Sequence, residues 1–396
     1  MNVFTTGGAG YIGSVVTELL LDSGHNVVVF DNLSTGHRAA VDPRATFVCG
    51  DTADPAGVRE AMRAAAPDVV VHMAAYIQMG ESMHDPGKYF RNNAANTLNV
   101  LDAMLAANVP RIVFSSTGGV YGTGGSLPFG LDLPIARLYP YCECKRQVES
   151  IIQWYAQAHG TTATVFRFFN AAGATAKYGE DHKPESHLIP IVLQVAQGAR
   201  PHLDLYGTDY ATRDGTASRD YIHVRDLAQA HLLAVEQMGA SLRNLSLDAA
   251  SPGESGGPPE IHPHPRITYG AGSNPLPQGR GDTSPAEQGD AGVSSRGNDG
   301  ASGVTIYNIG SEEGATNLEV IEMARRITGC PIPARECPRR PGDAAASLAS
   351  AEKIRRELGW KPAYSDLETI ISSAWDWEQR HPNGYGSVPS LSLGEG

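Results

Sequence analysis

The stretch TTGGAGYIG, residues 5–13, decides the fold. A short apolar segment, residues 2–6, leads into it, and a helical pattern of apolar residues follows it as far as Ser23. The glycines Gly7, Gly10 and Gly13 form a Gly-x-x-Gly-x-x-Gly pattern, whose missing side chains let the backbone approach a pyrophosphate at a helix amino terminus. A strand, a tight turn and a helix in this order predict a dinucleotide-binding turn rather than a glycine-rich turn without a ligand.

An acidic residue lies where such a turn needs one. The second apolar segment, residues 26–30, ends in Asp31, which is 18 residues past Gly13. This spacing is close to the roughly 20 residues expected for an acid that holds the adenosine ribose hydroxyls. Because a carboxylate there repels an additional phosphate, the sequence favours NAD over NADP.

The rest of the chain predicts an α/β fold with a doubly wound parallel sheet and a smaller interleaved α/β lobe that binds the substrate. Apolar runs alternate with helical patterns, which is typical of a parallel sheet covered on both faces. The runs after Asp31 are 46–48, 69–72, 111–115 and 164–168, and the longest helical patterns are 86–107 and 139–159. We expect an NAD-binding Rossmann domain over 1–169 and a substrate-binding lobe over 170–385, partly interleaved with the first domain. Within that lobe, a helix is expected around 188–197, a strand at 221–224 and a helix from there to about Met238.

One segment of the second half fits neither domain. Residues 251–300 hold 11 glycines and 8 prolines, which exceeds the share of roughly 25–30% at which disorder is expected. We therefore predict a disordered Gly/Pro/Ser-rich insertion over 248–302 and a flexible tail over 386–396. A binding segment is the less favoured alternative for the insertion, since it contains no amphipathic helix and no block of charge.

Composition excludes several classes of protein. The formal net charge is −12, which repels a polyanion, so we expect no nucleic-acid partner. No apolar stretch reaches about 18 residues and no basic-then-apolar leader opens the chain, so neither a membrane span nor export is expected. The five cysteines lack metal-site spacing, which favours reduced thiols in the cytoplasm and no metal site. Cys142-x-Cys144 is interpreted as two helix positions rather than a redox pair.

A tyrosine and a lysine open the helical pattern at 139–159. Tyr141 and Lys145 are four residues apart and so share one helix face. A phenol has a pKa near ~10, and a nearby ammonium group can lower it by about 1–3 units. The pair alone also fits an ordinary surface helix, but the glycine turn and the hydroxyl residue Thr117 upstream favour a catalytic Thr-Tyr-Lys group.

A family resemblance rests on these and further motifs. Alongside the glycine turn and Tyr-x-x-x-Lys stand DNLSTG (31–36), HMAA (72–75), GES (80–82), NN (92–93), SSTGGVYG (115–122), FRFFNAAGA (166–174), SRDYIHV (218–224), YNIG (307–310) and RRPGD (339–343). With them the chain resembles the extended short-chain dehydrogenases/reductases, and among these the UDP-glucose 4-epimerase branch. The resemblance covers nearly the whole chain except the insertion and the tail.

The resemblance implies two sets of binding residues. The implied NAD contacts beyond the glycines are Tyr11, Ile12, Asp31, Asn32, Ser34, Thr35, Gly36, Asp51, Thr52, Met73, Ala74, Ala75, Asn92, Lys145 and Phe169. The implied contacts with a UDP-sugar are Thr117, Tyr141, Asn170, His187, Leu188, Asp204, Tyr206, Arg219, Arg340, Asp343 and Ser347. Two of these, Arg219 and Arg340, have the chemistry to pair with a diphosphate, although without the resemblance they would be read as solvated charges.

The implied reaction is an isomerisation in galactose metabolism. Tyr141 takes the proton of the sugar 4-hydroxyl while NAD accepts the hydride, the 4-keto sugar turns over, and the hydride returns to the other face. Dehydratases and decarboxylases of the superfamily carry an acid just after the hydroxyl residue, whereas Gly118 and Gly119 follow Thr117 here. A non-catalytic NAD-binding sensor is the alternative from another class. Three departures support it: the Cys142-Glu143-Cys144 run, the two glycines and the insertion.

Sugar choice and assembly are further expectations of the resemblance. Ser347 matches the position whose size limits the sugar pocket, and a small serine predicts tolerance of an N-acetyl group at carbon 2, with UDP-pentoses as another possibility. A homodimer is expected through the helices near 86–107 and 139–159. The apolar stripe of Val148, Ile151, Ile152 and Tyr155 fits either that interface or packing on the sheet.

Overall fold

The computed structural model describes residues 1–136, 138–250, 303–340 and 342–386, with side chains omitted over 241–250. Most of the predicted insertion and nearly all of the predicted tail lie outside these residues. The exceptions are residues 248–250, which are helical, and Gly386.

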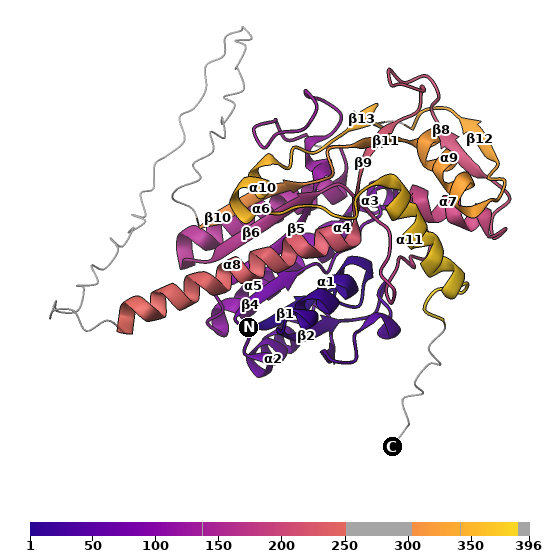
Figure 1. The fold of residues 1–396 in the computed structure, drawn as a ribbon. Helices are drawn as coiled ribbons and strands as arrows, with labels where there is room; N and C mark the ends of the chain where they lie inside the picture. The colour runs from indigo at the N-terminus through magenta and orange to yellow at the C-terminus, as the bar shows by residue number, and fades with distance from the viewer. Residues whose placement is uncertain (137, 251–302, 341, 387–396) are drawn as a thin grey trace, which may run out of the picture.

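Seven parallel strands form the central sheet, which confirms the predicted doubly wound fold (Figure 1). Their order across the sheet is β10-β6-β5-β4-β1-β2-β3, and each neighbouring pair is parallel. The strands are β1 (Asn2–Thr6), β2 (Asn26–Asp31), β3 (Thr46–Cys49), β4 (Val69–His72), β5 (Arg111–Thr117), β6 (Thr162–Phe168) and β10 (Val304–Ile309). The strand order reverses between β1 and β4, and ligands of open α/β sheets bind in the crevice at the carboxyl ends of such strands.

Helices cover both faces of this sheet, each over its own hydrophobic core. One face is covered by α1 (Tyr11–Asp22), α8 (Val224–Ala250) and α10 (Glu352–Leu358), and the other by α2 (Pro55–Ala65), α5 (Asn96–Ala106) and α6 (Pro140–His159). In Figure 1, α8 runs along the sheet as one long helix. The predicted helix end near Met238 is wrong, because the Ala- and Leu-rich sequence after it favours helix. Gly239 is tolerated inside the helix because a Cβ there would lie 2.6 Å from Sδ of Met1.

The predicted helix over 86–107 is interrupted. The chain passes through α3 (Met79–His84) and α4 (Pro86–Tyr89) into η2 (Phe90–Ala95), a π-helical turn, before α5 begins. Such turns are frequent at functional sites, and this one contains Asn92.

The second lobe gathers at one end of the molecule (Figure 1). Its sheets consist of β7 (Asn170–Ala172), β9 (Ser218–His223), β11 (Gly314–Thr316) and β13 (Ala346–Ser347), and of β8 (Leu203–Tyr206) with β12 (Ala334–Cys337). Its helices are α7 (Leu188–Ala196), α9 (Asn317–Thr328) and α11 (Leu367–Arg380), which pack around a third core. Because β10 pairs with β6, the chain crosses back into the large sheet after this lobe has begun. The domain boundary at 169/170 stays a prediction.

Among the described helices, none combines the length and the apolar character needed to cross a lipid bilayer.

Candidate active site

The glycine turn between β1 and α1 is packed too tightly for side chains. Gly7 has a φ of +74°, and a Cβ on it would lie 2.6 Å from the backbone nitrogen of Ala74, at the end of β4. A Cβ on Gly13 would lie 2.1 Å from the carbonyl oxygen of Gly7. Gly10 is the N-cap residue of α1, so the helix amino terminus faces the turn. This arrangement is the one that a pyrophosphate requires.

Asp31 ends β2 beside this turn. Its carboxylate accepts hydrogen bonds from the backbone nitrogens of Ala9 (3.0 Å) and Leu33 (2.8 Å), which fixes its position. Burial raises its pKa, although these backbone bonds oppose the shift. Nearby, Asn32 donates to the carboxylate of Asp51 at 2.9 Å, so these two residues predicted at the adenosine end lie together. Ser34 and Thr35 are exposed on the loop after them, while Thr52 is buried.

The segment after β4 is held by the π-helical turn. The side chain of Asn93 accepts from the backbone nitrogen of Tyr76 at 2.9 Å and donates to its carbonyl oxygen at 2.8 Å. Asn92 in turn donates to Asn93 at 2.8 Å. The predicted cofactor contacts at 73–75 directly follow β4. The backbone just after them, at Tyr76, is held by Asn93 of the π-helical turn, which lies outside the sheet.

The predicted catalytic residues meet at the carboxyl end of β5. Thr117 is the last residue of that strand, and Tyr141 lies in the first turn of α6. Tyr141 is 7% exposed and hydrogen-bonds with Thr117. Lys145, 4% exposed, donates from Nζ to the carbonyl oxygen of Ser115 at 2.8 Å. The three side chains thus come from two adjacent elements, and all are removed from water.

The electrostatics of this group differ from the expectation that Lys145 lowers the pKa of Tyr141. Burial raises the pKa of Tyr141 well above its usual value, and the hydrogen bond with Thr117 opposes the shift. Burial also lowers the pKa of Lys145 to about 8, while Cys144 and Glu149 oppose that change. Desolvation is the largest cause of both shifts, because it disfavours the charged form of each group.

The two glycines after Thr117 are packed rather than loose. A Cβ on Gly118 would lie 2.5 Å from the ring of Phe169, and one on Gly119 would lie 2.6 Å from Sγ of Cys142. Thr117 itself is fixed, because its hydroxyl accepts a hydrogen bond from the nitrogen of Gly119 at 3.1 Å. Gly119 and Cys142, which both suggested a loosened site in the sequence, are therefore complementary. The side chain of Cys142 occupies the space that a side chain at position 119 would fill.

The cysteines of α6 are buried and protonated. Burial raises the pKa of Cys142 to about 12 and that of Cys144 to about 12. A thiol in this state is neither a good nucleophile nor a ready metal ligand. Both are free thiols at ordinary helix positions, as the sequence indicated.

Four of the predicted UDP-sugar contacts come together in the second lobe. Arg219 pairs with Asp343 and also donates to the carbonyl oxygen of Ala344 at 2.9 Å. The guanidinium carbon of Arg340 lies 3.8 Å from the ring centroid of Tyr206. Since Asp343 donates from its backbone to Arg340 at 3.2 Å, the two pairs share one turn of the chain. Two arginines with planar guanidinium groups suit a diphosphate.

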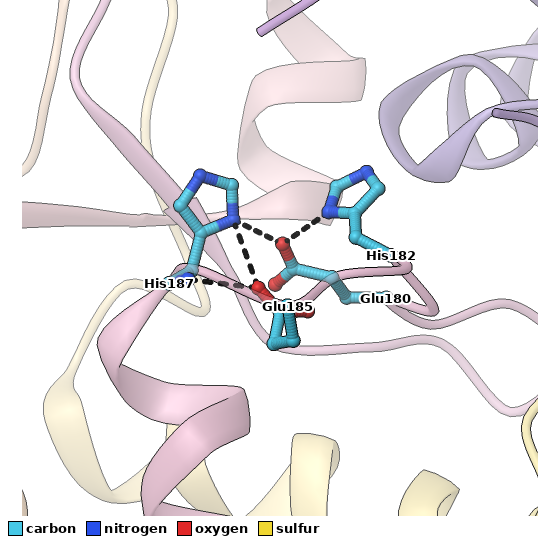
Figure 2. Close-up of side chains that lie close together, drawn as sticks. All are labelled: Glu180, His182, Glu185 and His187. Atoms are coloured by element: carbon cyan, nitrogen blue, oxygen red, sulfur yellow. Dashed lines mark hydrogen bonds and ion pairs between the residues drawn. The ribbon is translucent and has the colours of Figure 1, made fainter. Parts of the chain in front are cut away.

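The remaining predicted contacts lie elsewhere in the lobe. Asp204 is paired with Arg335, at 2.7 Å, in the two-stranded sheet. Asn170 donates to the carbonyl oxygen of Asp220 at 2.9 Å. Ser347 stands opposite Arg219 in the β13–β9 pair. His187 and Leu188 begin α7, and the side chain of His187 faces a pair of glutamates (Figure 2).

Sequence reasoning missed three features of the site. Tyr139, the N-cap of α6, lies at the loop that carries Arg340 and Asp343, since a Cβ on Gly342 would be 3.1 Å from its hydroxyl. Glu149 accepts from Ser116 (2.5 Å) and Arg167 (3.0 Å), which ties α6 to β5 and β6 below Lys145. The third feature is the group of glutamates and histidines in Figure 2. Only the last had a sequence signal, the pattern Glu-x-His-x-x-Glu-x-His at 180–187.

The chain is similar to a known protein family and to characterised members of it. A family model described as the NAD dependent epimerase/dehydratase family matches residues 3–245. The UDP-glucose 4-epimerase of Lacticaseibacillus casei is 40% identical over 388 residues, covering 98% of this chain and 99% of that protein.

Solved structures agree. That of UDP-glucose 4-epimerase from Brucella ovis in complex with NAD is 35% identical, with a TM-score of 0.77, over 94% of this chain and 97% of that one. The enzyme of the same name from Bifidobacterium longum, in complex with NAD+ and UDP, is 30% identical with a TM-score of 0.77, over 97% of this chain and 100% of the other.

Proposed function

The chain belongs to the NAD-dependent epimerase/dehydratase family, and on this premise we propose the residues by which it works as an NAD-dependent UDP-glucose 4-epimerase. The proposed set of catalytic residues rests mainly on Tyr141. It is buried, hydrogen-bonded with Thr117, and placed on the first turn of the helix that follows β5. That position is at the carboxyl edge of the sheet, where the glycine turn also opens.

NAD is the cofactor, and the residues around the turn fit it. Gly7, Gly10 and Gly13 leave the backbone bare for a pyrophosphate, and Asp31 is held where its carboxylate can accept from ribose hydroxyls. We place the remaining adenosine contacts along 32–36 and at Asp51 and Thr52. When bound, NAD supplies the acceptor and donor of the hydride at carbon 4 of the sugar.

Tyr141 is the proposed group that transfers the proton of the sugar 4-hydroxyl. A phenol with a raised pKa holds its proton tightly and is a weak acid, so it serves as a base only when nearby positive charge offsets the effect of burial. The ammonium group of Lys145 and the positive charge of an oxidised nicotinamide provide that charge. Tyr141 then removes the proton of the 4-hydroxyl and later returns it, while Thr117 orients the same hydroxyl by a hydrogen bond.

Inversion requires that the sugar turn over while its nucleotide stays in place. Arg219 and Arg340 are the proposed anchors of the diphosphate, supported by Asp343 and Tyr206. Both anchors belong to the second lobe, whereas Tyr141 and Thr117 belong to the first. The oxidised sugar is therefore tethered only at its far end, and both faces of carbon 4 can be presented to one hydride donor.

The reaction consumes no NAD, which makes the function simple to test. Purified protein should interconvert UDP-glucose and UDP-galactose without added NAD, and denatured protein should release about one NAD per chain. Bound NAD without interconversion would instead support the non-catalytic sensor. Phe169 and Cys142 pack closely against Gly118 and Gly119. This close packing argues against the sensor, because the glycines do not loosen the catalytic site.

We propose that the small side chain of Ser347 also admits UDP-N-acetylglucosamine. A Ser347→Tyr substitution should overpack the pocket at a cost of about 1–3 kcal/mol, a loss of about 5- to 150-fold. The ratio of kcat/KM for UDP-N-acetylglucosamine to that for UDP-glucose should fall by this factor, whereas Ser347→Ala should preserve it. An unchanged ratio in the tyrosine variant would remove Ser347 from the pocket wall.

A homodimer through α5 and α6 is the proposed assembly. Of the predicted stripe, Val148 and Ile152 are buried against the sheet, so packing in the core explains them. The same two helices nevertheless expose Trp154 (69%) and Leu98 (38%). Large apolar side chains at this exposure suit an interface.

Trp154→Glu should therefore dissociate the dimer. Sedimentation equilibrium should give two 42.0 kDa chains for the parent and one for the variant. Ile135→Glu, which places the same charge at a side chain 41% exposed in a different part of the surface, should remain dimeric. A monomeric parent would contradict this assembly.

We also place the enzyme in the cytoplasm, a reducing compartment that suits its free thiols.

A further inference from the structure

Two imidazoles and two carboxylates converge on one loop outside the catalytic group. Glu180, His182, Glu185 and His187 lie between β7 and α7, and one ligand atom from each falls within 4.8 Å of all the others. Figure 2 shows both imidazoles turned toward the carboxylate of Glu180, with Glu185 below His187. We propose that these four side chains bind a divalent transition-metal ion, with Zn²⁺ the best match to the donor set.

The spacing of the donor atoms suits such an ion. Nδ1 of His182 lies 3.0 Å from Oε1 of Glu180, and Nδ1 of His187 contacts that same oxygen. Nδ1 of His187 also lies 3.7 Å from Oε1 of Glu185. Ligand atoms placed tetrahedrally at about 2.0–2.2 Å from zinc are themselves about 3.3–3.6 Å apart. The observed separations lie on both sides of that value.

The chemistry of the donors selects the class of metal. Imidazole nitrogen together with carboxylate oxygen suits zinc and other late first-row ions, whereas Ca²⁺ and Mg²⁺ prefer oxygen alone. Four protein ligands describe a closed, structural site rather than one with a position open for substrate.

The charge of the cluster suits a cation as the shared partner of its carboxylates. The side chains of Glu180 and Glu185 are only 6% and 3% exposed. Within the described ranges, the basic groups in ion-pair distance of these two carboxylates are the imidazoles themselves. Buried carboxylates are costly unless they are paired, and a dication bound by all four side chains would pair with both in place of the imidazole protons.

A second observation is a small cavity that Glu180 helps to line. The cavity, of about 10 Å³, is lined by the carboxylates of Glu180 and Glu378 together with apolar residues such as Ile189 and Trp377. This space, next to the cluster, admits about one small ion or water molecule.

A metal ion here would join the two halves of the binding site. His187 is the N-cap of α7, directly before Leu188, and both are proposed contacts of the UDP-sugar. The ring of His182 packs edge-on against Tyr11, the first residue of α1, with centroids 6.4 Å apart. The ion would hold the start of α7 relative to the glycine turn, acting on position rather than on the chemistry of Tyr141.

The first test is metal content, and it needs no turnover. Full-length protein loaded with Zn²⁺ alone and freed of excess should retain about one zinc ion per chain by mass spectrometry, as a closed four-ligand site predicts. After chelation, adding Zn²⁺ should raise Tm and adding Mg²⁺ should not. His182→Ala and Glu180→Gln should lose the bound zinc. His84→Ala removes an exposed imidazole that bonds only the carbonyl oxygen of Gly80 among the described contacts, and it should keep the zinc.

The opposing results are equally definite. If the parent retains no zinc after loading, the cluster is an ion-pair network closed by imidazole protons, and the proposal is wrong. Equal zinc in the parent and in a folded His182→Ala variant would place the metal elsewhere. If that variant does not fold, a competition titration of the parent with a coloured zinc chelator decides instead. Because these readouts involve no UDP-sugar, they stand apart from any failure of epimerase activity.

Discussion

Replacing Tyr141 with phenylalanine should lower kcat by about 10²- to 10⁴-fold, the range that a positioned proton-transfer group contributes. The substitution removes one oxygen and keeps the buried ring, so the packing of α6 on β5 should survive. NAD should remain at about one per chain, since the glycine turn is untouched. A stopped assay of UDP-galactose formation, with NAD measured in the denatured protein, tests both statements.

Tyr364→Phe is the matched control for this experiment. Tyr364 is 37% exposed, and its ring contacts His223 and Arg225 rather than the catalytic group. The control should keep the parent's kcat, because only a peripheral hydroxyl is lost. If kcat of the Tyr141→Phe enzyme stays within tenfold of the parent's, some group other than Tyr141 transfers the proton. The proposed mechanism would then be wrong.

Gly13→Ala should abolish NAD binding. The added Cβ would lie 2.1 Å from the carbonyl oxygen of Gly7 and 2.8 Å from Cα of Gly8, both backbone atoms that no side-chain rotation can move. The helix α1 must then shift from the strand, and the space for the pyrophosphate is lost. NAD released on denaturation should fall from about one per chain to almost none, and turnover should fall with it.

Gly124→Ala controls for the loss of a glycine. A Cβ on Gly124 meets no heavy atom within 4 Å, and its φ does not lie in the left-handed region. This variant should keep both NAD and activity. Circular dichroism separates loss of the cofactor from loss of the fold in Gly13→Ala. A folded Gly13→Ala protein that still carries NAD would show that the cofactor does not depend on this turn.

Local sequence patterns were sufficient for the central sheet but not for its last strand. The place of β10 beside β6 depends on a contact between segments more than a hundred residues apart. Periodicity cannot supply such a contact. The end of α8 was misjudged for a related reason, because Gly239 in the sequence resembles a stop and is explained only by Met1 packed against it.

The catalytic group was predictable because its members occupy fixed points of the topology. Thr117 ends a parallel strand and Tyr141 begins the helix that packs beside it, so proximity follows from the order of elements. The pKa of Tyr141 was not predictable in the same way. Its direction depends on how completely the phenol is buried, because burial is the largest cause of the raised pKa.

The features missed by sequence analysis are those in which one departure compensates another. Cys142 and Gly119 each looked like a defect in the sequence, and only their contact explains them. His187 was assigned alone and His182 was not assigned, although their spacing with Glu180 and Glu185 is the informative pattern. Convergence of four side chains depends on the path of an irregular loop, which neither helix nor strand periodicity describes.

The most direct measurement follows the hydrogen at carbon 4. UDP-glucose carrying deuterium at that carbon should give UDP-galactose in which the deuterium is retained at carbon 4, in ordinary water and without added NAD. Retention means that the hydride left the sugar and returned within one site, as oxidation by bound NAD requires. Replacement of the deuterium by solvent hydrogen, or no conversion by NAD-loaded protein, would contradict the account.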